Sequence, residues 1–233
     1  MIQIFNFLDL LFPQRCIFCG KIMPPGGKIC AGCKTDAYLI GPDICPKCGR
    51  DAGKCSCAED AGALCFDSCI APFYYTGSAK SAILRFKFQG LPQNGPFLAK
   101  FIYDRIEEKY SGLNFDFISF VPSHPEKKKA RGYNQSEILA INAAKYLCLP
   151  LEGEVLVKTA NKTPQHELTR AERFKNIAGT FSAPKPRTVS GKKILLIDDI
   201  LTTGSTLGEC AKTLKAAGAE EVRAAVFAAT NII

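Results

Sequence analysis

Residues 194 to 207 read ILLIDDILTTGSTL, and this stretch decides the fold. Its apolar start predicts a buried strand, because strands covered on both faces are almost continuously hydrophobic. Two adjacent acids, Asp198 and Asp199, follow at the expected strand end, and a hydroxyl-rich loop then leads into a helix expected over residues 204–217. Ligands of open parallel sheets bind beyond the carboxyl ends of the strands. The stretch therefore predicts a ligand site.

The loop has the composition of a phosphate cradle. Free backbone amides at a helix N-terminus attract anions, and the hydroxyls and the one glycine add donors and room. The residues concerned are Thr202, Thr203, Gly204, Ser205 and Thr206. The neighbouring carboxylates suit ribose hydroxyls or Mg²⁺. Neither the P-loop spacing nor the dinucleotide glycine pattern occurs at this strand, so the predicted ligand is a sugar phosphate.

The rest of the chain after residue 70 alternates between strand-like and helix-like segments. Further strands are expected at 117–121, 154–158 and 222–227, and a helix is expected at 134–147. Gly218 is placed to end the last helix. Alternation of this kind predicts an α/β fold with a mostly parallel sheet flanked by helices.

Ten of the twelve cysteines lie between residues 16 and 69, and without a secretory signal this favours metal over disulfides. Two Cys-x-x-Cys hooks predict one tetrahedral zinc site, formed by Cys16, Cys19, Cys30 and Cys33. A second group predicts either a second zinc site or an empty one, and consists of Cys45, Cys48, Cys55 and Cys57. Cys65 or Cys69 is an alternative ligand there. Four thiolates leave no open position, so such zinc is structural.

The two outlying cysteines are interpreted differently from the rest. Cys210 falls on an apolar helical face with Leu207 and Leu214, and Cys148 is likewise assigned to the core.

Length and composition indicate two units. The 233 residues suit one domain with a small accessory unit, and the Cys-, Gly- and Pro-rich composition gives way to periodic apolar segments near residue 70. We therefore expect an N-terminal helix and zinc-binding module over 1–69 and a larger domain over 70–233. The small unit needs metal in place of a core. The formal charge is +8, and two zinc–thiolate sites would reduce it to about +4.

The first twelve residues have apolar positions at helical spacing, which predicts a short amphipathic helix docked on the domain. Attachment to a membrane surface is the alternative, although the polar face lacks Lys and Arg. The stretch lacks the features of a signal peptide, and no apolar run is long enough to span a membrane. We expect a cytoplasmic protein.

Taken together, the motifs resemble those of type I phosphoribosyltransferases and, within them, the ComF family of late competence proteins, which includes ComFC and GntX-type proteins. Residues 194–207 resemble the signature for phosphoribosyl pyrophosphate (PRPP). The other matching motifs are Tyr75-x-Gly77, Leu84-x-Phe86-Lys87-Phe88, Val121-Pro122, Arg131-Gly132-Tyr133-Asn134-Gln135 and Thr163-x-Gln165-x-x-Leu168-x-x-x-x-Arg173-x-x-Asn176. The resemblance implies a type I phosphoribosyltransferase fold behind an N-terminal zinc module.

The resemblance also implies roles for single residues. Asp198 and Asp199 would be the catalytic acids that hold the ribose hydroxyls, and residues 202–206 would bind the 5-phosphate. A loop beginning at Ser123 would grip pyrophosphate with Mg²⁺, and residues 159–173 would form a mobile loop that closes over PRPP. The further pyrophosphate and mobile-loop residues would be Lys87, Arg131, Gln165, Arg170 and Arg173.

Three functions fit these observations. The first is an active phosphoribosyltransferase with an unknown acceptor, because no segment indicates a nucleobase pocket. The second is a PRPP-binding protein of DNA uptake that contacts single-stranded DNA and a protein of the competence machinery. The third is a PRPP-responsive regulator or scaffold without turnover. His124 is either a proton donor to the leaving group or an ordinary surface residue.

Overall fold

The computed structural model describes residues 13–57, 64–159 and 170–231, and its centre is a five-stranded parallel sheet. The strand order is β1-β7-β6-β3, and β2 also pairs with β7. The strands are β1 (Ser68–Ile70), β2 (Phe73–Tyr74), β3 (Phe117–Phe120), β6 (Lys193–Leu201) and β7 (Glu221–Ala229). The predicted parallel sheet is confirmed.

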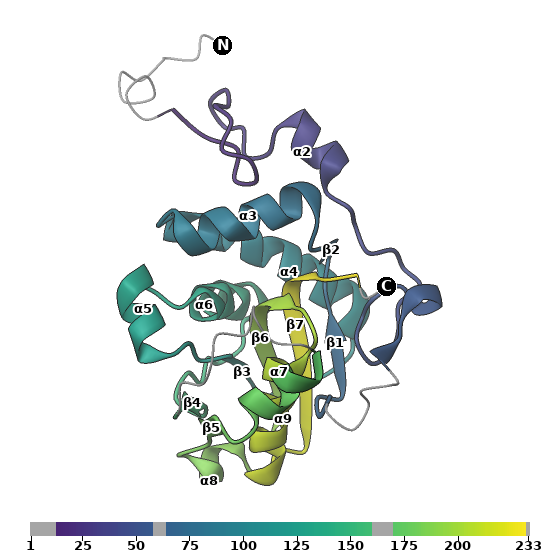
Figure 1. The fold of residues 1–233 in the computed structure, drawn as a ribbon, viewed down its shortest axis with the longest axis vertical. Coiled ribbons are helices and arrows are strands. Elements are labelled where there is room, and N and C mark those ends of the chain that lie inside the picture. The colour runs from purple at the N-terminus through teal and green to yellow at the C-terminus, as the bar shows by residue number, and fades with distance from the viewer. Residues whose placement is uncertain (1–12, 58–63, 160–169, 232–233) are drawn as a thin grey trace.

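Helices cover both faces of this sheet (Figure 1). One face carries α3 (Gly77–Phe88), α4 (Gly95–Tyr110) and α6 (Gln135–Leu147), and the other carries α7 (Arg170–Ile177) and α9 (Ser205–Ala216). Alternation along β6 supplies both layers, because Leu195 and Ile197 join the core beneath α4 and α6, whereas Ile194 and Leu196 join the core beneath α9. The strand is therefore buried on both sides, as its apolar run predicts.

The remaining elements are short. They are α2 (Ala31–Asp36), η1 (Ala52–Lys54), η3 (Pro92–Asn94), α5 (Pro125–Arg131), β4 (Val157–Lys158), β5 (Phe181–Ser182) and α8 (Pro186–Val189). Among the described ranges, no helix is both long enough and apolar enough to cross a membrane. The amphipathic helix predicted for residues 1–12 lies outside the described residues.

The strand predicted at 154–158 is wrong for most of its length. Only β4 is extended, and it pairs antiparallel with β5 outside the main sheet. Val155 and Leu156 are buried because they fill the core on the α9 face, without lengthening the sheet. Leu151 makes the single bridge to Ile118 on β3. An apolar run alone does not separate these two kinds of burial.

Both cysteine-rich units pack into the cores of the larger domain. Phe18, between the first pair of cysteines, is 1% exposed and contacts Phe73 and Phe227 at centroid distances of 5.8 and 6.1 Å. Residues of the second unit join the core beneath α9. The unit expected to lack a core therefore shares the main one. The division between residues 69 and 70 stays a prediction, and β1 runs across it.

Cys210 is fully buried, as predicted, but the assignment of Cys148 to the core is wrong. Cys148 is exposed and ends α6 in the left-handed conformation, with φ of 53°. The helix ends at Leu147, so Cys148 does not continue its buried face.

Candidate ligand site and zinc centres

The two adjacent acids lie inside β6, because the strand continues to Leu201. Asp198 pairs with Val226 of β7, whereas the neighbouring strand β3 ends at Phe120, opposite Ile197. The expectation that β6 ends at residue 197 is therefore wrong, since β7 extends the pairing by four residues. The acids still emerge beyond the end of β3, at the carboxyl edge of the sheet where ligands of such folds bind.

Asp198 is held by the N-terminus of α6. Its Oδ1 accepts hydrogen bonds from the Ser136 hydroxyl at 2.6 Å and from the Asp199 amide at 2.9 Å. Burial and the adjacent charge of Asp199 raise the pKa of Asp198 to about 7. The side chain therefore holds its proton at a higher pH than an exposed carboxyl does, and a nearby cation would favour its ionised form.

Asp199 is paired with the lysine predicted to serve the same site. Lys87 Nζ lies 2.8 Å from Asp199 Oδ2, and both side chains are largely buried. Burial lowers the pKa of Lys87, but the Asp199 carboxylate more than offsets this, so the pKa lies above its usual range. Two segments more than a hundred residues apart in the sequence thus meet at one charge pair.

The loop after β6 has the backbone geometry of a tight cradle. Gly204 has φ of 83°, a conformation that favours glycine, and α9 begins at the next residue. The Thr203 hydroxyl donates to Ser205 Oγ at 3.0 Å and accepts from the Ser205 amide at 3.4 Å. The N-cap residue Gly204 has no side chain to cap α9, so apart from the Ser205 amide the first-turn amides have no intrahelical acceptor and no side-chain cap from that position. The arrangement suits a phosphate group.

Two buried polar atoms without a partner among the described residues lie where β3 leads into α6. They are Ser123 Oγ and Gln135 Nε2. Asn134 ties the two segments together, because its side-chain amide donates to the Val121 carbonyl at 3.0 Å. Buried polar groups are normally hydrogen-bonded, so unpaired donors at a site edge fit a ligand that brings oxygen atoms.

Arg131 lies at the end of α5, close to these donors. Its Nη1 donates to Gln135 Oε1 at 3.0 Å, and its guanidinium stacks over Phe88 at 5.1 Å. His124 Nδ1 accepts from the Glu126 amide at 3.3 Å and so caps α5. The position of Arg131 is compatible with its predicted role. His124 has a structural role in addition.

The predicted mobile loop is described only at its end. Arg170 and Arg173 belong to α7, whereas Gln165 and the rest of 160–169 lie outside the described residues. Their roles stay predictions.

Sequence reasoning missed several residues at this site. Ser136 bonds Asp198, and half-buried Tyr75, whose pKa burial raises, lies near Lys87 and Asp199. Lys158 of β4 lies over the Phe181 ring at 5.3 Å and is within electrostatic range of Asp198, and burial together with the charge of Lys127 lowers its pKa. The Tyr75 and Gln135 motifs were visible in the sequence, but nothing local marked Ser136 or Lys158 as neighbours of the acids.

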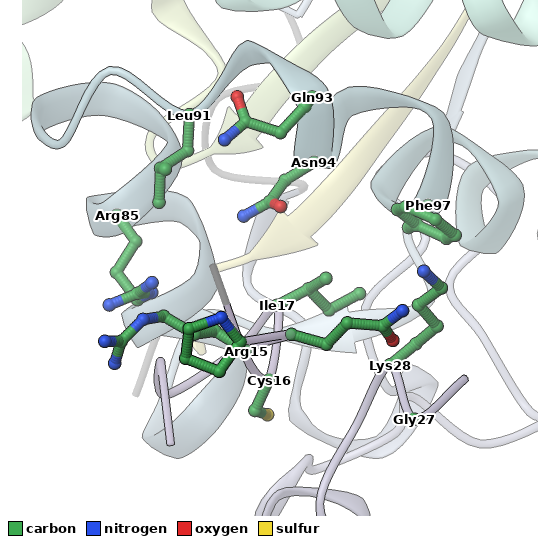
Figure 2. Close-up of a pocket in the computed structure, with 12 residues that line it drawn as sticks. Arg15, Cys16, Ile17, Gly27, Lys28, Arg85, Leu91, Gln93, Asn94 and Phe97 are labelled. Carbon is green, nitrogen blue, oxygen red and sulfur yellow. The ribbon is translucent and has the colours of Figure 1, made fainter. Parts of the chain in front are cut away.

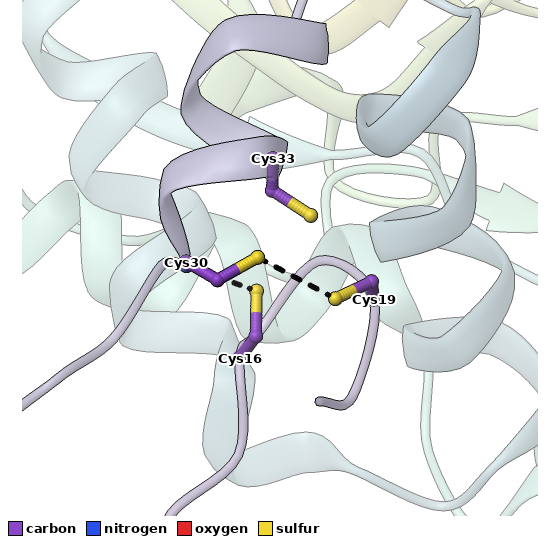
Figure 3. A group of neighbouring side chains, drawn as sticks. All are labelled: Cys16, Cys19, Cys30 and Cys33. Carbon is purple, nitrogen blue, oxygen red and sulfur yellow. Dashed lines mark hydrogen bonds between the residues drawn. The ribbon is translucent and has the colours of Figure 1, made fainter. Parts of the chain in front are cut away.

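The first cysteine group forms a compact cluster (Figure 3). The four sulfur atoms lie within 4.8 Å of one another, with Cys19 and Cys30 Sγ 3.7 Å apart. Cys33 comes from α2, and the Gly20 amide closes the turn after Cys19 by donating to the Cys16 carbonyl at 2.8 Å. These spacings suit the edges of a tetrahedron around Zn²⁺ with Zn–S bonds of about 2.3 Å. The cluster fits a structural zinc.

The second cysteine group repeats this construction. Its four sulfur atoms also lie within 4.8 Å of one another, with Cys45 and Cys57 Sγ 3.6 Å apart. The Gly49 amide donates to the Cys45 carbonyl at 2.9 Å, which gives the same turn as in the first group. Cys69 is buried in β1 and stands apart from this set, so the alternative ligand assignment is not supported. Both groups fit zinc, and each closes its site with four thiolates.

A basic concavity lies between the first cysteine group and helices α3 and α4 (Figure 2). Its described lining includes Arg15, Lys28 and Arg85 but no acid. Lys28 Nζ lies 4.7 Å from the centroid of the Phe97 ring. Arg85 Nε is buried and has no partner among the described residues. This surface is separate from the acids on β6, and its charge suits a polyanion.

Two protein families match this chain. The phosphoribosyl transferase domain family matches residues 135–232, and the double zinc ribbon domain family matches residues 7–70. The first range contains the β6 acids and the loop, and the second contains both cysteine groups. The phosphoribosyltransferase fold with an N-terminal zinc-binding module is thereby confirmed, and the zinc is structural.

Similar proteins match the chain over nearly its whole length. Competence protein F of Haemophilus influenzae is 26% identical, covering 96% of this chain and 97% of that protein. Competence protein ComFC of Streptococcus pneumoniae is 29% identical, covering 90% and 97%. DNA utilization protein YhgH of Escherichia coli is 26% identical, covering 92% and 96%. The likeness therefore spans the cysteine groups and the sheet together.

Proposed function

Because the chain belongs to the ComF family of the phosphoribosyltransferase superfamily, we propose that it binds PRPP together with Mg²⁺ at the carboxyl edge of β6. The observation that supports this most strongly is the convergence of Asp198, Asp199 and Lys87 beside the N-terminus of α9. One edge of the sheet thus offers anions for a ribose and amides for a phosphate.

Each part of PRPP has a matching part of the site. The 5-phosphate would lie in loop 202–206, and the ribose hydroxyls would contact Asp198 and Asp199. Ser123 and Arg131 would hold the pyrophosphate from the opposite side, where the unpartnered Ser123 hydroxyl and Gln135 amide offer free donors. Asp198 and Asp199 would hold Mg²⁺, which would supply positive charge to neutralise the leaving group.

This arrangement also favours turnover. Loss of pyrophosphate from the ribose leaves positive charge on the sugar, which Asp198 and Asp199 would stabilise, while Arg131 and Lys87 would stabilise the leaving group. We propose a phosphoribosyltransferase activity toward an acceptor that the site does not name. Pyrophosphate release in a panel of nucleobases, amines and DNA tests this, and a PRPP-binding chain that releases none is a regulator or scaffold.

The ligand assignment has a direct test. PRPP with Mg²⁺ should raise the melting temperature of the zinc-loaded chain, since a ligand at a hundred times its dissociation constant stabilises by about 2.7 kcal/mol. Asp199→Asn should abolish most of this shift. Asp116→Asn is the matched control, because Asp116 is an exposed acid bonded to Lys192 and Lys193 at the opposite end of the sheet. Absence of any shift in the wild-type chain would refute the assignment.

A second proposal concerns DNA. The relatives are named for competence and DNA utilization, and the basic concavity beside the first zinc site offers Arg15, Lys28 and Arg85 to a phosphate backbone. We propose that the protein acts in DNA uptake or use and contacts single-stranded DNA on this surface.

The DNA proposal is tested by the salt dependence of binding to a labelled single strand. Affinity should fall steeply with salt, because contacted phosphates release counterions. Lys28→Ala with Arg15→Ala should lower the slope by about two, since each lost cation removes about one contact. Lys192→Ala with Lys193→Ala, on the far end of β6, should leave the slope unchanged. An equal decrease of the salt-dependence slope in both double variants would show that binding depends only on the net charge of the protein.

A further inference from the structure

Arg50 belongs to the second zinc ribbon, yet its side chain lies against the loop proposed to hold phosphate. The residue is 3% exposed. Its Nε donates to the Thr230 carbonyl at 2.7 Å, and its Nη2 donates to the carbonyls of Thr202 and, at 3.5 Å, of Leu201. One guanidinium therefore joins the end of β6, the start of the loop and the residue that follows β7.

These bonds control the direction of the loop amides. In a trans peptide the carbonyl and the amide of the next residue point to opposite sides of one rigid plane. By holding the Thr202 carbonyl, Arg50 directs the Thr203 amide away from itself. The Thr230 hydroxyl holds the same carbonyl at 3.2 Å, so the plane is fixed by two donors. The buried positive charge also favours an anion in the loop.

The position of Arg50 depends in turn on the second cysteine cluster. Its carbonyl accepts from the Cys45 amide at 2.7 Å, and it follows Cys48 by two residues. The turn at Gly49 lies against β1 so closely that a Cβ there would come within 2.2 Å of the Cys69 carbonyl oxygen. Without an ion nothing links the four sulfur atoms, and the turn that carries Arg50 loses this support.

We propose that Arg50 is a positioning residue that couples the second zinc site to the phosphate loop, so that zinc and PRPP bind cooperatively. This inference rests on the PRPP binding proposed above. Linkage makes the coupling reciprocal: zinc raises the affinity for PRPP by the factor by which PRPP raises the affinity for zinc. Couplings of this kind are typically about 5- to 150-fold.

The wild-type chain alone gives the first test. Zinc release into a chelator is followed with a colorimetric zinc indicator, with and without PRPP and Mg²⁺. Titrated with the chelator to equilibrium, the two cysteine clusters should give two steps of zinc loss, and PRPP should raise the chelator concentration needed for one step at least about fivefold. Zinc loss that is unchanged by saturating PRPP overturns the coupling, because a ligand that binds more tightly when zinc is present must protect the zinc.

Substitution of Arg50 gives the second test. Arg50→Met should weaken PRPP binding at least about fivefold in calorimetry and abolish protection of zinc by PRPP, while two zinc ions remain bound. Arg50→Lys should restore part of the PRPP affinity and part of the zinc protection, since lysine keeps the positive charge but lacks the planar guanidinium donors. Arg105→Met is the matched control, because Arg105 is also buried and donates to a backbone carbonyl, that of Gly41 at 2.9 Å, which belongs to neither cysteine group. It should change neither PRPP binding nor zinc protection.

The outcomes separate the two proposals. A wild-type chain that shows no PRPP binding contradicts the proposed ligand, and the coupling falls with it. A wild-type chain that binds PRPP equally well with and without zinc contradicts the coupling alone. If Arg50→Met loses zinc or fails to fold, the zinc-release measurement on the wild-type chain still decides the matter. A role of Arg50 in folding alone would lower stability but leave protection of zinc by PRPP intact.

Discussion

Asp198 lies where its own charge is unfavourable in the absence of ligand. The carboxylate is surrounded by the end of the sheet, by α6 and by a second acid, and the Ser136 hydroxyl, the Asp199 amide and the charge of Lys87 only partly offset its burial. A buried acid with a raised pKa beside a second carboxyl group is characteristic of ligand and catalytic sites. The destabilisation is compatible with a function in which a cation binds.

The charge of Asp198 makes stability depend on pH in a defined direction. The folded-state pKa, about 7, lies above the value of 3.8 expected for an unfolded chain. The folded protein therefore holds a proton that the unfolded chain releases, and this residue's contribution to stability falls as pH rises from about 4 to about 7. Asp198→Asn should remove this loss and raise the melting temperature at pH 8 by at least about 4 °C without ligand.

Thermal melts of both chains between pH 5 and pH 8 check this expectation, and the gap between them should widen toward pH 8. The same variant should lose the stabilisation by PRPP. Asp116→Asn serves again as the control, because lysine contacts lower the pKa of Asp116 and its ionised form stabilises the fold. A variant of Asp198 that melts below the wild type at pH 8 would show that the carboxylate is needed for folding.

At the residue scale, the sequence predicts which residues carry the chemistry of the site, but not which distant residues contact them. The acids and the hydroxyl loop were recognisable because they are contiguous. Ser136 and Arg50 lie 62 and 151 residues from the groups they contact, and no local pattern records such distances. Lys87 was connected to the site only through resemblance, and the 2.8 Å contact with Asp199 gives that connection a physical basis.

At the level of elements, the turn between β6 and α9 depends on Gly204. A side chain there would be strained by φ of 83° and would also meet Leu64 Cδ2 at 2.4 Å. Gly204→Ala should therefore destabilise the chain by more than the roughly 1–2 kcal/mol that left-handed backbone alone costs. Gly26→Ala is the matched control, because Gly26 has φ of 81° and nothing within 4 Å of the added methyl group.

Urea unfolding in zinc-containing buffer compares the two glycine variants. Equal costs would show that Leu64 moves aside and that only backbone strain matters. The larger cost expected for Gly204 should also appear as weaker PRPP binding, since the loop changes shape, whereas Gly26→Ala should bind PRPP as the wild type does.

Element boundaries show where local patterns fail. Adjacent acids are poor strand formers, yet β6 continues through Asp198 and Asp199. Pairing with β7 through Leu201 overrides that preference. The opposite error occurs at 154–158, where apolar residues fill a core beside α9 and only β4 is extended. In both cases the neighbouring element determines where the strand begins or ends. A single sequence does not show which element will be the neighbour.

At the scale of the whole molecule, the zinc ribbons belong to the same folded unit as the sheet. Phe18 packs against Phe73 and Phe227, and Arg50 bonds the ends of β6 and β7. Removal of zinc should therefore lower the stability of the entire chain. The expected result is one melting transition that moves to lower temperature with chelator, seen equally by circular dichroism and by proteolysis of the sheet.

Independent ribbons would behave differently. They would lose their structure on chelation while the sheet kept its melting temperature, giving two separate transitions. Addition of Zn²⁺ should restore the single transition, because apo ribbons refold only around the metal. The pH and the salt concentration are held constant during chelation, so that a change in melting temperature reports the loss of zinc.

The strand order has a consequence for how the chain folds. The central strand β7 follows every other strand in the sequence, and its partner residue for Ser68 is Arg223. Neither β1 nor β2 has a place in the sheet until β7 has been synthesised. The cysteine turns close over a few residues and form early, whereas sequence-distant pairings form slowly. We therefore expect the metal-bound ribbons to form before the sheet is complete. The carboxyl edge of β6 then takes its final shape only when β7 pairs with it.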